Sequence, residues 1–164
     1  MTPDGLRKLL CRAEGESHDF KAKLHDTSSP RGKVSLVCDV LSLANTPREG
    51  DAHIVFGVKE LGNGSIDRVG VDAVPDDADW QQIFGSAVEP LPRFSLEPVH
   101  LDGLLYAVLT VHLERHGPYL VRSEWRNKFS KEVGRALTPN PEHGLCGLRQ
   151  RSWCAVEGVL EGDR

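Results

Sequence analysis

Three residues near the N-terminus have types and a spacing that suit phosphate chemistry. Glu14 precedes Asp19 by five positions, and Lys21 follows Asp19 by two. In metal-dependent nucleases, carboxylates hold divalent cations that activate water, while a lysine on the same strand face stabilises the developing charge. Residues 17–24 alternate in polarity, so Asp19 and Lys21 point the same way on a predicted half-buried strand. The spacing therefore indicates catalytic candidates Glu14, Asp19 and Lys21, and it also fits the exposed face of an ordinary strand.

A second group of residues suits contact with polyanions. The whole chain has a formal net charge of −4, which argues against a nonspecific polycationic binder. Residues 115–151 nevertheless carry eight Lys or Arg against three acidic residues, a local net charge of +5. Trp125 lies between two arginines, where an aromatic ring can stack on a base. The segment predicts either a basic binding face or a solvated loop, and the candidate nucleic-acid-binding residues are Lys23, Arg122, Trp125, Arg126, Lys128 and Lys131.

Histidines and cysteines form weaker patterns. His18 and His53 are candidates for proton transfer near the acidic residues, although such histidines are more often exposed or held in the core. His143, Cys146 and Cys154 could supply three zinc ligands, but their irregular spacing favours small apolar side chains on a C-terminal helix. The four cysteines form no Cys-x-x-Cys pair, so we expect reduced thiols.

The elements that must position these residues follow from periodicity and turn residues. Thr2-Pro3 begins a predicted amphipathic helix, and Pro30 begins a mostly buried one that ends at 45–47. The apolar run 52–58 is typical of a central strand. The remaining predictions are a hairpin partner at 66–71, a helix over 75–88, a hairpin over 94–113 turning at Asp102-Gly103, short strands over 118–122 and 129–137, and a closing helix over 145–160.

Length and composition favour a single globular domain of the α+β class. The chain has 164 residues, of which 39% are hydrophobic and 27% charged, so it is neither disordered nor a coiled coil. We expect one domain over residues 1–164, with a core at about 6–137. No stretch approaches the roughly 18 apolar residues of a membrane span. The first residues lack the features of a secretory signal, so we expect a cytoplasmic protein without a membrane partner.

The order of three motifs resembles one known family. Asp19-Phe20-Lys21, the helix end Ala44-Asn45-Thr46 and the strand 54–58 follow one another as in the Schlafen AlbA-like domain (the Schlafen AlbA-2 type), which is described as DNA-binding. Further matches at 70–71, 106–108 and 117–119 extend the resemblance over about residues 6–122. It implies an α+β fold with a twisted, mostly antiparallel sheet flanked by helices, and a role in binding RNA or DNA through a basic groove.

The resemblance also implies a place for an acidic pocket. Schlafen members with ribonuclease activity hold three acidic residues there, and Glu14 and Asp19 fit the first two by spacing. Lys59 occupies the position expected for the third, which argues against efficient cleavage. Glu60 and Asp51 are the nearby carboxylates that could complete the set. The metal candidates are therefore Glu14, Asp19 and Glu60, with Mg²⁺ or Mn²⁺ as the cofactor if the site is catalytic.

These observations favour a nucleic-acid-binding module of the Schlafen AlbA-like type. One alternative is a metal-dependent endoribonuclease acting on structured RNA such as tRNA. Another is a protein-interaction or regulatory subunit, which fits the net charge of −4. The ribonuclease-competent Schlafen core looks like two related lobes clasping RNA, and this chain has the length of one. We therefore expect a homodimer or a place in a larger assembly.

Overall fold

The computed structural model describes residues 1–12, 15, 17–61, 64–114 and 118–131. These residues form two compact units that alternate along the chain. The first unit consists of Met1–Leu24, Pro47–Gln81 and Arg93–Leu113. The second consists of His25–Thr46, Gln82–Pro92 and the described residues from Glu114 onward.

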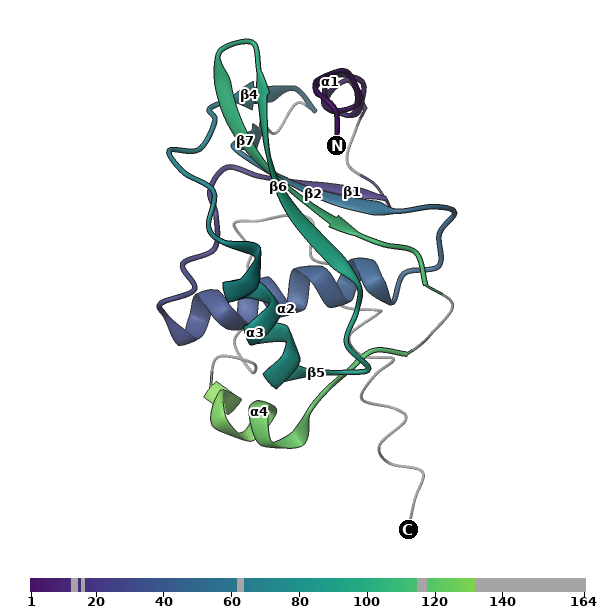
Figure 1. Cartoon of the computed structure of the whole chain (residues 1–164), viewed down its shortest axis with the longest axis vertical. Coiled ribbons are helices and arrows are strands. Elements are labelled where there is room, and N and C mark those ends of the chain that lie inside the picture. The colour runs from purple at the N-terminus through teal and green to yellow at the C-terminus, as the bar shows by residue number, and fades with distance from the viewer. Residues whose placement is uncertain (13–14, 16, 62–63, 115–117, 132–164) are drawn as a thin grey trace. The chain divides into compact units, whose positions relative to one another are not determined.

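The first unit is built on a four-stranded sheet in the order β1-β2-β7-β6 (Figure 1). Its strands are β1 (His18–Lys21), β2 (Ala52–Phe56), β7 (Leu104–Val111) and β6 (Phe94–Leu101). Strand β1 pairs with β2 in parallel, and the other two pairs are antiparallel. The predicted mostly antiparallel sheet is thus confirmed, whereas the central strand predicted at 52–58 ends at Phe56 and β1 is shorter than the predicted 17–24.

The predicted central strand is interrupted at Gly57. This residue has φ +96°, and a Cβ there would lie 2.8 Å from the Cα of Gly70. Only glycine fits such a close approach at positive φ. Beyond Gly57 the chain continues as β3 (Val58–Glu60), which pairs with β4 (Ile66–Arg68) in a separate two-stranded hairpin.

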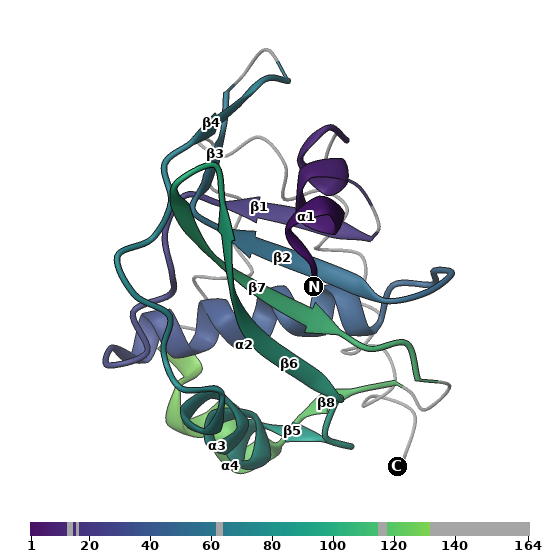
Figure 2. The same cartoon turned by 45° about the horizontal axis from the view of Figure 1, so that its top comes forward.

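The hairpin of β6 and β7 confirms the turn predicted from sequence. Asp102 and Gly103 have φ values of 52° and 80°. Two successive residues with positive φ make a type I′ turn, whose twist matches that of the strands it joins. Figure 2 shows its two strands in the sheet, with β7 beside β2 and β6 at the edge.

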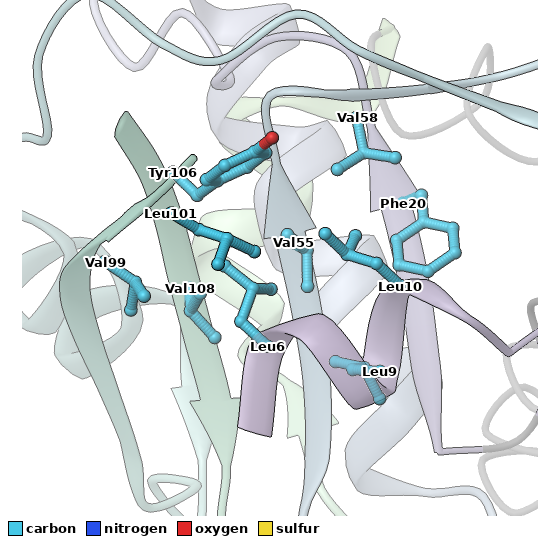
Figure 3. Close-up of a cluster of buried hydrophobic side chains, with 10 residues drawn as sticks. All are labelled: Leu6, Leu9, Leu10, Phe20, Val55, Val58, Val99, Leu101, Tyr106 and Val108. Carbon is cyan, nitrogen blue, oxygen red and sulfur yellow. The ribbon is translucent and has the colours of Figure 1, made fainter. Parts of the chain in front are cut away.

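Helix α1 (Pro3–Leu10) packs against one face of this sheet. The Thr2 side chain accepts a hydrogen bond from the Gly5 N–H, and proline follows at the first helical position, as the sequence predicts. The buried cluster beneath the helix contains Leu6, Leu9, Leu10, Phe20, Val55, Val58, Val99, Leu101, Tyr106 and Val108 (Figure 3). We call the side of the sheet that carries Phe20 and Val55 the α1 face.

The second unit contains helix α2 (Pro30–Ala44), a two-stranded ribbon and helix α4 (Ser123–Lys128). The Ser29 side chain caps α2 by accepting from the Gly32 N–H, and Asn45 ends it, in agreement with the prediction. The ribbon pairs β5 (Val88–Glu89) with β8 (Leu120–Val121). Helix α3 (Asp77–Ala87) leads into β5 and confirms the helix predicted at 75–88.

The C-terminal predictions have mixed outcomes. Strand β8 falls inside the short strand predicted at 118–122, whereas helix α4 was not foreseen. The strand predicted at 129–137 does not begin within residues 129–131, and its remainder lies outside the described residues. The closing helix at 145–160 and the zinc candidates His143, Cys146 and Cys154 also lie outside them. In the described part of the chain, no helix is long and apolar enough to cross a membrane.

Candidate nucleic-acid interface

Asp19 and Lys21 share one face of β1, as their spacing predicts. Lys21 Nζ lies 2.8 Å from Asp19 Oδ2. The Asp19 side chain is 6% exposed and that of Lys21 is 23% exposed. A buried carboxylate needs a compensating cation, because desolvation of an unpaired charge is costly. Lys21 therefore supplies at least part of the charge that keeps Asp19 in the interior.

The described carboxylates do not assemble into a metal site. Glu14 lies outside the described residues, and so its predicted part in a site with Asp19 stays a prediction. Glu60 lies on β3, beyond the break at Gly57, with the exposed Lys59 before it. Asp51 is bonded instead to His112, at Nδ1, and to the backbone of Leu113. Among the described histidines, cysteines and carboxylates, no group of three is placed to hold a metal ion.

The two candidate histidines lie on the opposite face of the sheet from Asp19. His18 pairs in register with His53, whereas Asp19 pairs with Ile54. Side chains alternate along a strand, so His18 and His53 share the α1 face with Phe20, and Asp19 faces away from it. These histidines are therefore not placed to transfer protons at Asp19, which agrees with the favoured interpretation that such histidines are exposed or held in the core.

Burial of His53 favours the neutral form of its imidazole. His53 Nδ1 lies 3.1 Å from Thr110 Oγ1. Burial lowers the pKa of His53 below its ordinary value, against the opposing effect of the Asp51 carboxylate. His18 is 5% exposed, and its ring packs on Phe20 with centroids 5.5 Å apart. These two side chains are thus parts of the sheet face.

The basic candidates of the second unit gather on and around α4. Arg122 is the residue before the helix; its backbone N–H donates to Ala87 O at 2.8 Å, and its Nη2 lies 3.6 Å from a Glu89 carboxylate oxygen. Arg126 is half-buried, and Lys128 and Lys131 are exposed. Residues 118–131 contain four basic residues and one acidic residue. This part of the chain therefore presents positive charge to solvent.

Trp125 has a different role from the one predicted. Its side chain is buried, at 7% exposure, and its ring packs against Phe129 with centroids 4.6 Å apart. A buried ring cannot stack on a base, so the predicted stacking contact is corrected to an anchoring one. Because Trp125 and Phe129 are four residues apart, they share one side of the chain and hold α4 by that side. Lys128 Nζ lies over the Phe129 ring, 5.4 Å from its centroid.

The remaining candidate, Lys23, is exposed two residues beyond β1 and belongs to the first unit. The exposed basic candidates are thus divided between the two units, with Lys23 in one and Arg122, Lys128 and Lys131 in the other.

Asn45 has a positioning role that was not predicted from the sequence. The Asn45 side chain donates from Nδ2 to Tyr119 O at 3.0 Å and accepts at Oδ1 from the Tyr119 N–H at 2.9 Å. Tyr119 precedes β8 and α4, so Asn45 holds the backbone that leads into the basic helix. The signal was present in the sequence, because both residues lie in motifs that carry the family resemblance, but their contact could not be read from it.

Comparisons with known proteins agree with this fold. The family described as "Schlafen, AlbA_2" matches residues 14–139. A search of curated proteins found no match. Among solved structures, the chain is similar to the N-terminal domain of a protein from Nitrosomonas europaea whose name relates it to the ATP-dependent DNA helicase RecG. The TM-score is 0.52 at 21% identity, over 75% of this chain and 82% of that domain.

A second solved structure is the DIP2311 protein from Corynebacterium diphtheriae, with a TM-score of 0.45 and 18% identity. The match covers 71% of this chain and 22% of that protein. The likeness to the Nitrosomonas domain shows a shared fold, and the family match spans well over half of the sequence. The chain belongs to the Schlafen AlbA_2 family.

Proposed function

We propose that this chain is a nucleic-acid-binding module whose contacts to phosphate come from the basic residues on and around α4. The observation that carries the proposal is the division of this segment into two sides. Trp125 and Phe129 are buried, whereas Lys128 and Lys131 are exposed. A helix anchored in this way presents its lysines to solvent in a fixed place, which favours contact with a regular row of phosphates.

Two similarities support the proposal. The chain belongs to the Schlafen AlbA_2 family, and its resemblance to the Schlafen AlbA-like domain implies binding of RNA or DNA. The Nitrosomonas domain is part of a protein whose name relates it to a DNA helicase. Both point to nucleic acid as the class of partner. A shared family and a shared fold do not determine which nucleic acid this chain binds, so the test includes both RNA and DNA.

The mechanism is electrostatic and makes a quantitative prediction. Lysines that neutralise phosphates release condensed counterions, so log K falls with log salt at a slope of about −0.7 to −0.9 for each phosphate neutralised. Lys128→Ala together with Lys131→Ala should therefore flatten the slope by about one to two units. Affinity should fall for all sequences alike, because phosphate contacts carry no base identity.

The experiment measures fluorescence anisotropy of a labelled DNA duplex, a single-stranded DNA and a tRNA from low to moderate salt, with and without Mg²⁺ or Mn²⁺. A matched control is Lys8→Ala with Arg12→Ala, which removes the same charge from exposed residues of the first unit. We expect the variant with Lys128→Ala and Lys131→Ala to bind more weakly and to show a shallower slope of log K against log salt. The control should change much less in both quantities. Equal losses in both would place the binding surface elsewhere. Absence of binding at every salt would favour a protein-interaction module.

The same mixtures test cleavage of structured RNA. Gel analysis of the tRNA after incubation with either divalent cation reports products directly. Intact tRNA in all mixtures would leave binding as the whole activity, and metal-dependent products that Glu14→Gln removes would support the endoribonuclease hypothesis.

A further inference from the structure

Three strands of the first unit bring a serine, a histidine and an aspartate into a chain of contacts. Asp51 directly precedes β2, Ser95 lies on β6, and His112 directly follows β7. His112 Nδ1 lies 3.0 Å from Asp51 Oδ2, and Ser95 Oγ lies 3.5 Å from His112 Nε2. The order is that of a nucleophile, a base and an orienting carboxylate, which is recognised by geometry and not by sequence position. Neither contact is predictable from the sequence, because the three residues are far apart in it.

The proton positions in this group follow from its partners. The backbone N–H of Leu113 holds the pKa of Asp51 below its ordinary value, and the side chain of His112 adds to the effect. Asp51 is therefore ionised near neutral pH and can only accept hydrogen bonds. The proton of a neutral His112 must then lie on Nδ1, which leaves the lone pair of Nε2 directed at Ser95 Oγ. The serine hydroxyl is thus the donor in the contact with His112.

The backbone around the group is braced on several sides. Leu113 N donates to Asp51 Oδ1 at 2.8 Å, and His112 N donates to Arg93 O at 2.9 Å. The Arg48 side chain donates to Gly50 O at 3.2 Å and to Val111 O at 3.3 Å. Gly50 and Val111 are the residues directly before Asp51 and His112. These bonds fix both members of the histidine–aspartate pair relative to the sheet.

The group is also accessible to a small molecule. The His112 side chain is 28% exposed and that of Asp51 is 42% exposed. Ser95 is half-buried on β6, which is an edge strand of the sheet. Ser17 offers a contrast: its Oγ lies 3.4 Å from His18 Nδ1, but that imidazole is only 5% exposed. The contact of Ser95 with His112 differs from that of Ser17 with His18 in two ways. Its imidazole is more exposed, and the Asp51 carboxylate lies against that imidazole.

We propose that Ser95 is a nucleophile, activated by His112 and Asp51, that accepts the acyl group of a small activated carboxylic ester. In this step Ser95 Oγ forms a bond to the carbonyl carbon, and the bond from that carbon to the leaving oxygen breaks. The serine proton passes to His112 Nε2 and from there to the leaving alkoxide, so His112 returns to its neutral form. This activity is separate from the proposed nucleic-acid binding and uses residues of the first unit alone.

An alkyl fluorophosphonate probes the same nucleophile. Its P–F bond breaks as the Oγ–P bond forms; fluoride leaves, and the serine proton is released through His112 to water. The experiment treats the folded full chain with the probe, measures intact mass over time and maps the adduct by peptide sequencing. We expect one adduct, on Ser95, and none on the same site after unfolding in urea.

Variants separate reactivity from structure. Ser95→Ala should abolish the adduct, whereas the matched control Ser17→Ala should label like the unaltered chain. His112→Ala should slow labelling by about 100-fold or more, the usual contribution of a general base. Asp51→Asn keeps an oxygen to accept from Leu113 N and should also slow labelling.

If these residues had a purely structural role, the folded, unaltered chain would not be labelled. The variants would then differ from it only in a lower unfolding midpoint. No adduct on the unaltered chain, an adduct that persists in Ser95→Ala, or equal rates in folded and unfolded chain would overturn the proposal.

Discussion

The side-chain amide of Asn45 pairs with both backbone groups of Tyr119, as a neighbouring strand would. The two hydrogen bonds measure 3.0 and 2.9 Å and join residues 74 positions apart. Asn45 ends α2, and Tyr119 introduces β8 and the basic helix α4. This pair therefore holds the backbone that precedes β8 and α4 against the end of α2.

Replacing Asn45 should therefore destabilise the second unit. Asn45→Ala leaves the N–H and C=O of the buried Tyr119 without the amide partner, and we expect a loss of about 1–3 kcal/mol in the free energy of unfolding. Urea denaturation followed by circular dichroism measures it. Asn127→Ala, at an exposed asparagine of α4, is the control and should be near neutral. Equal stability of the two variants would contradict the positioning role.

Trp125 should matter for binding only as an anchor. Trp125→Phe keeps an aromatic ring against Phe129 and should bind tRNA or duplex DNA with nearly unchanged affinity. Trp125→Ala removes a large buried side chain, and such truncations cost about 3–5 kcal/mol, so α4 and its lysines should lose their place. Anisotropy titrations with thermal melts on the same samples compare the variants. A large loss of affinity in a stably folded Trp125→Phe variant would restore the stacking role.

The Asp19–Lys21 pair predicts a stability effect with a characteristic rescue. Asp19→Asn removes the negative charge beside a largely buried ammonium, and we expect a loss of about 1–3 kcal/mol. Adding Lys21→Met removes the cation that Asp19 no longer neutralises and should recover much of that loss. A double-mutant cycle in urea gives the coupling free energy. Additive losses would show that the two charges, although 2.8 Å apart, do not depend on each other.

The edge of the sheet at β6 is protected by side chains of α3. Asp77 Oδ1 accepts from the Leu96 N–H at 2.9 Å, and the Gln81 amide donates to Phe94 O at 3.1 Å. An exposed edge strand with free backbone groups is a template for pairing between chains. Asp77→Ala should therefore increase self-association, measured by light scattering over a range of concentrations. Asp79→Ala makes the same charge change at an exposed position of the same helix and should not. If Asp77→Ala and Asp79→Ala self-associate to the same extent, Asp77 does not protect the edge strand.

His53 predicts the pH dependence of stability near neutrality. Burial lowers its pKa in the folded state below the ordinary 6.5, so the unfolded chain binds more protons between the two values. Stability from this group is fully present above pH 6.5 and is lost as the pH falls through the folded-state pKa. The charges that modulate it are Asp51, which raises the pKa, and the N-terminal ammonium, His18 and His112, which lower it.

The test compares urea midpoints at pH 8, 7, 6 and 5. The unaltered chain should lose stability toward pH 5, and His53→Gln should lose less. His100→Gln, at an exposed histidine of β6, should behave like the unaltered chain. The prediction fails if His53→Gln loses as much stability over this range as the unaltered chain.

Local features of the fold could be predicted because their causes lie within a few residues. Thr2 caps α1 through the N–H three residues on, and Ser29 does the same for α2. Asp102-Gly103 forms its turn because these two residues tolerate positive φ. The shared face of Asp19 and Lys21 follows from strand alternation alone.

The sequence by itself thus determined the α+β class, most of the elements and the order of motifs that marks the family. Only the tertiary structure decided which side chains meet. Trp125 is buried because its environment supplies Phe129 and an apolar interior, and a flanking arginine in the sequence carries no information about that. His18 and Asp19 point to opposite faces of the sheet because side chains alternate along a strand, and only the tertiary structure decided which of those faces α1 covers. Asn45 with Tyr119, and Ser95 with His112 and Asp51, are joined by strand pairing and helix ends across long stretches of chain. Contacts of this kind depend on the packing of the whole unit. The free energy of that packing is shared among many residues, so no short segment predicts them.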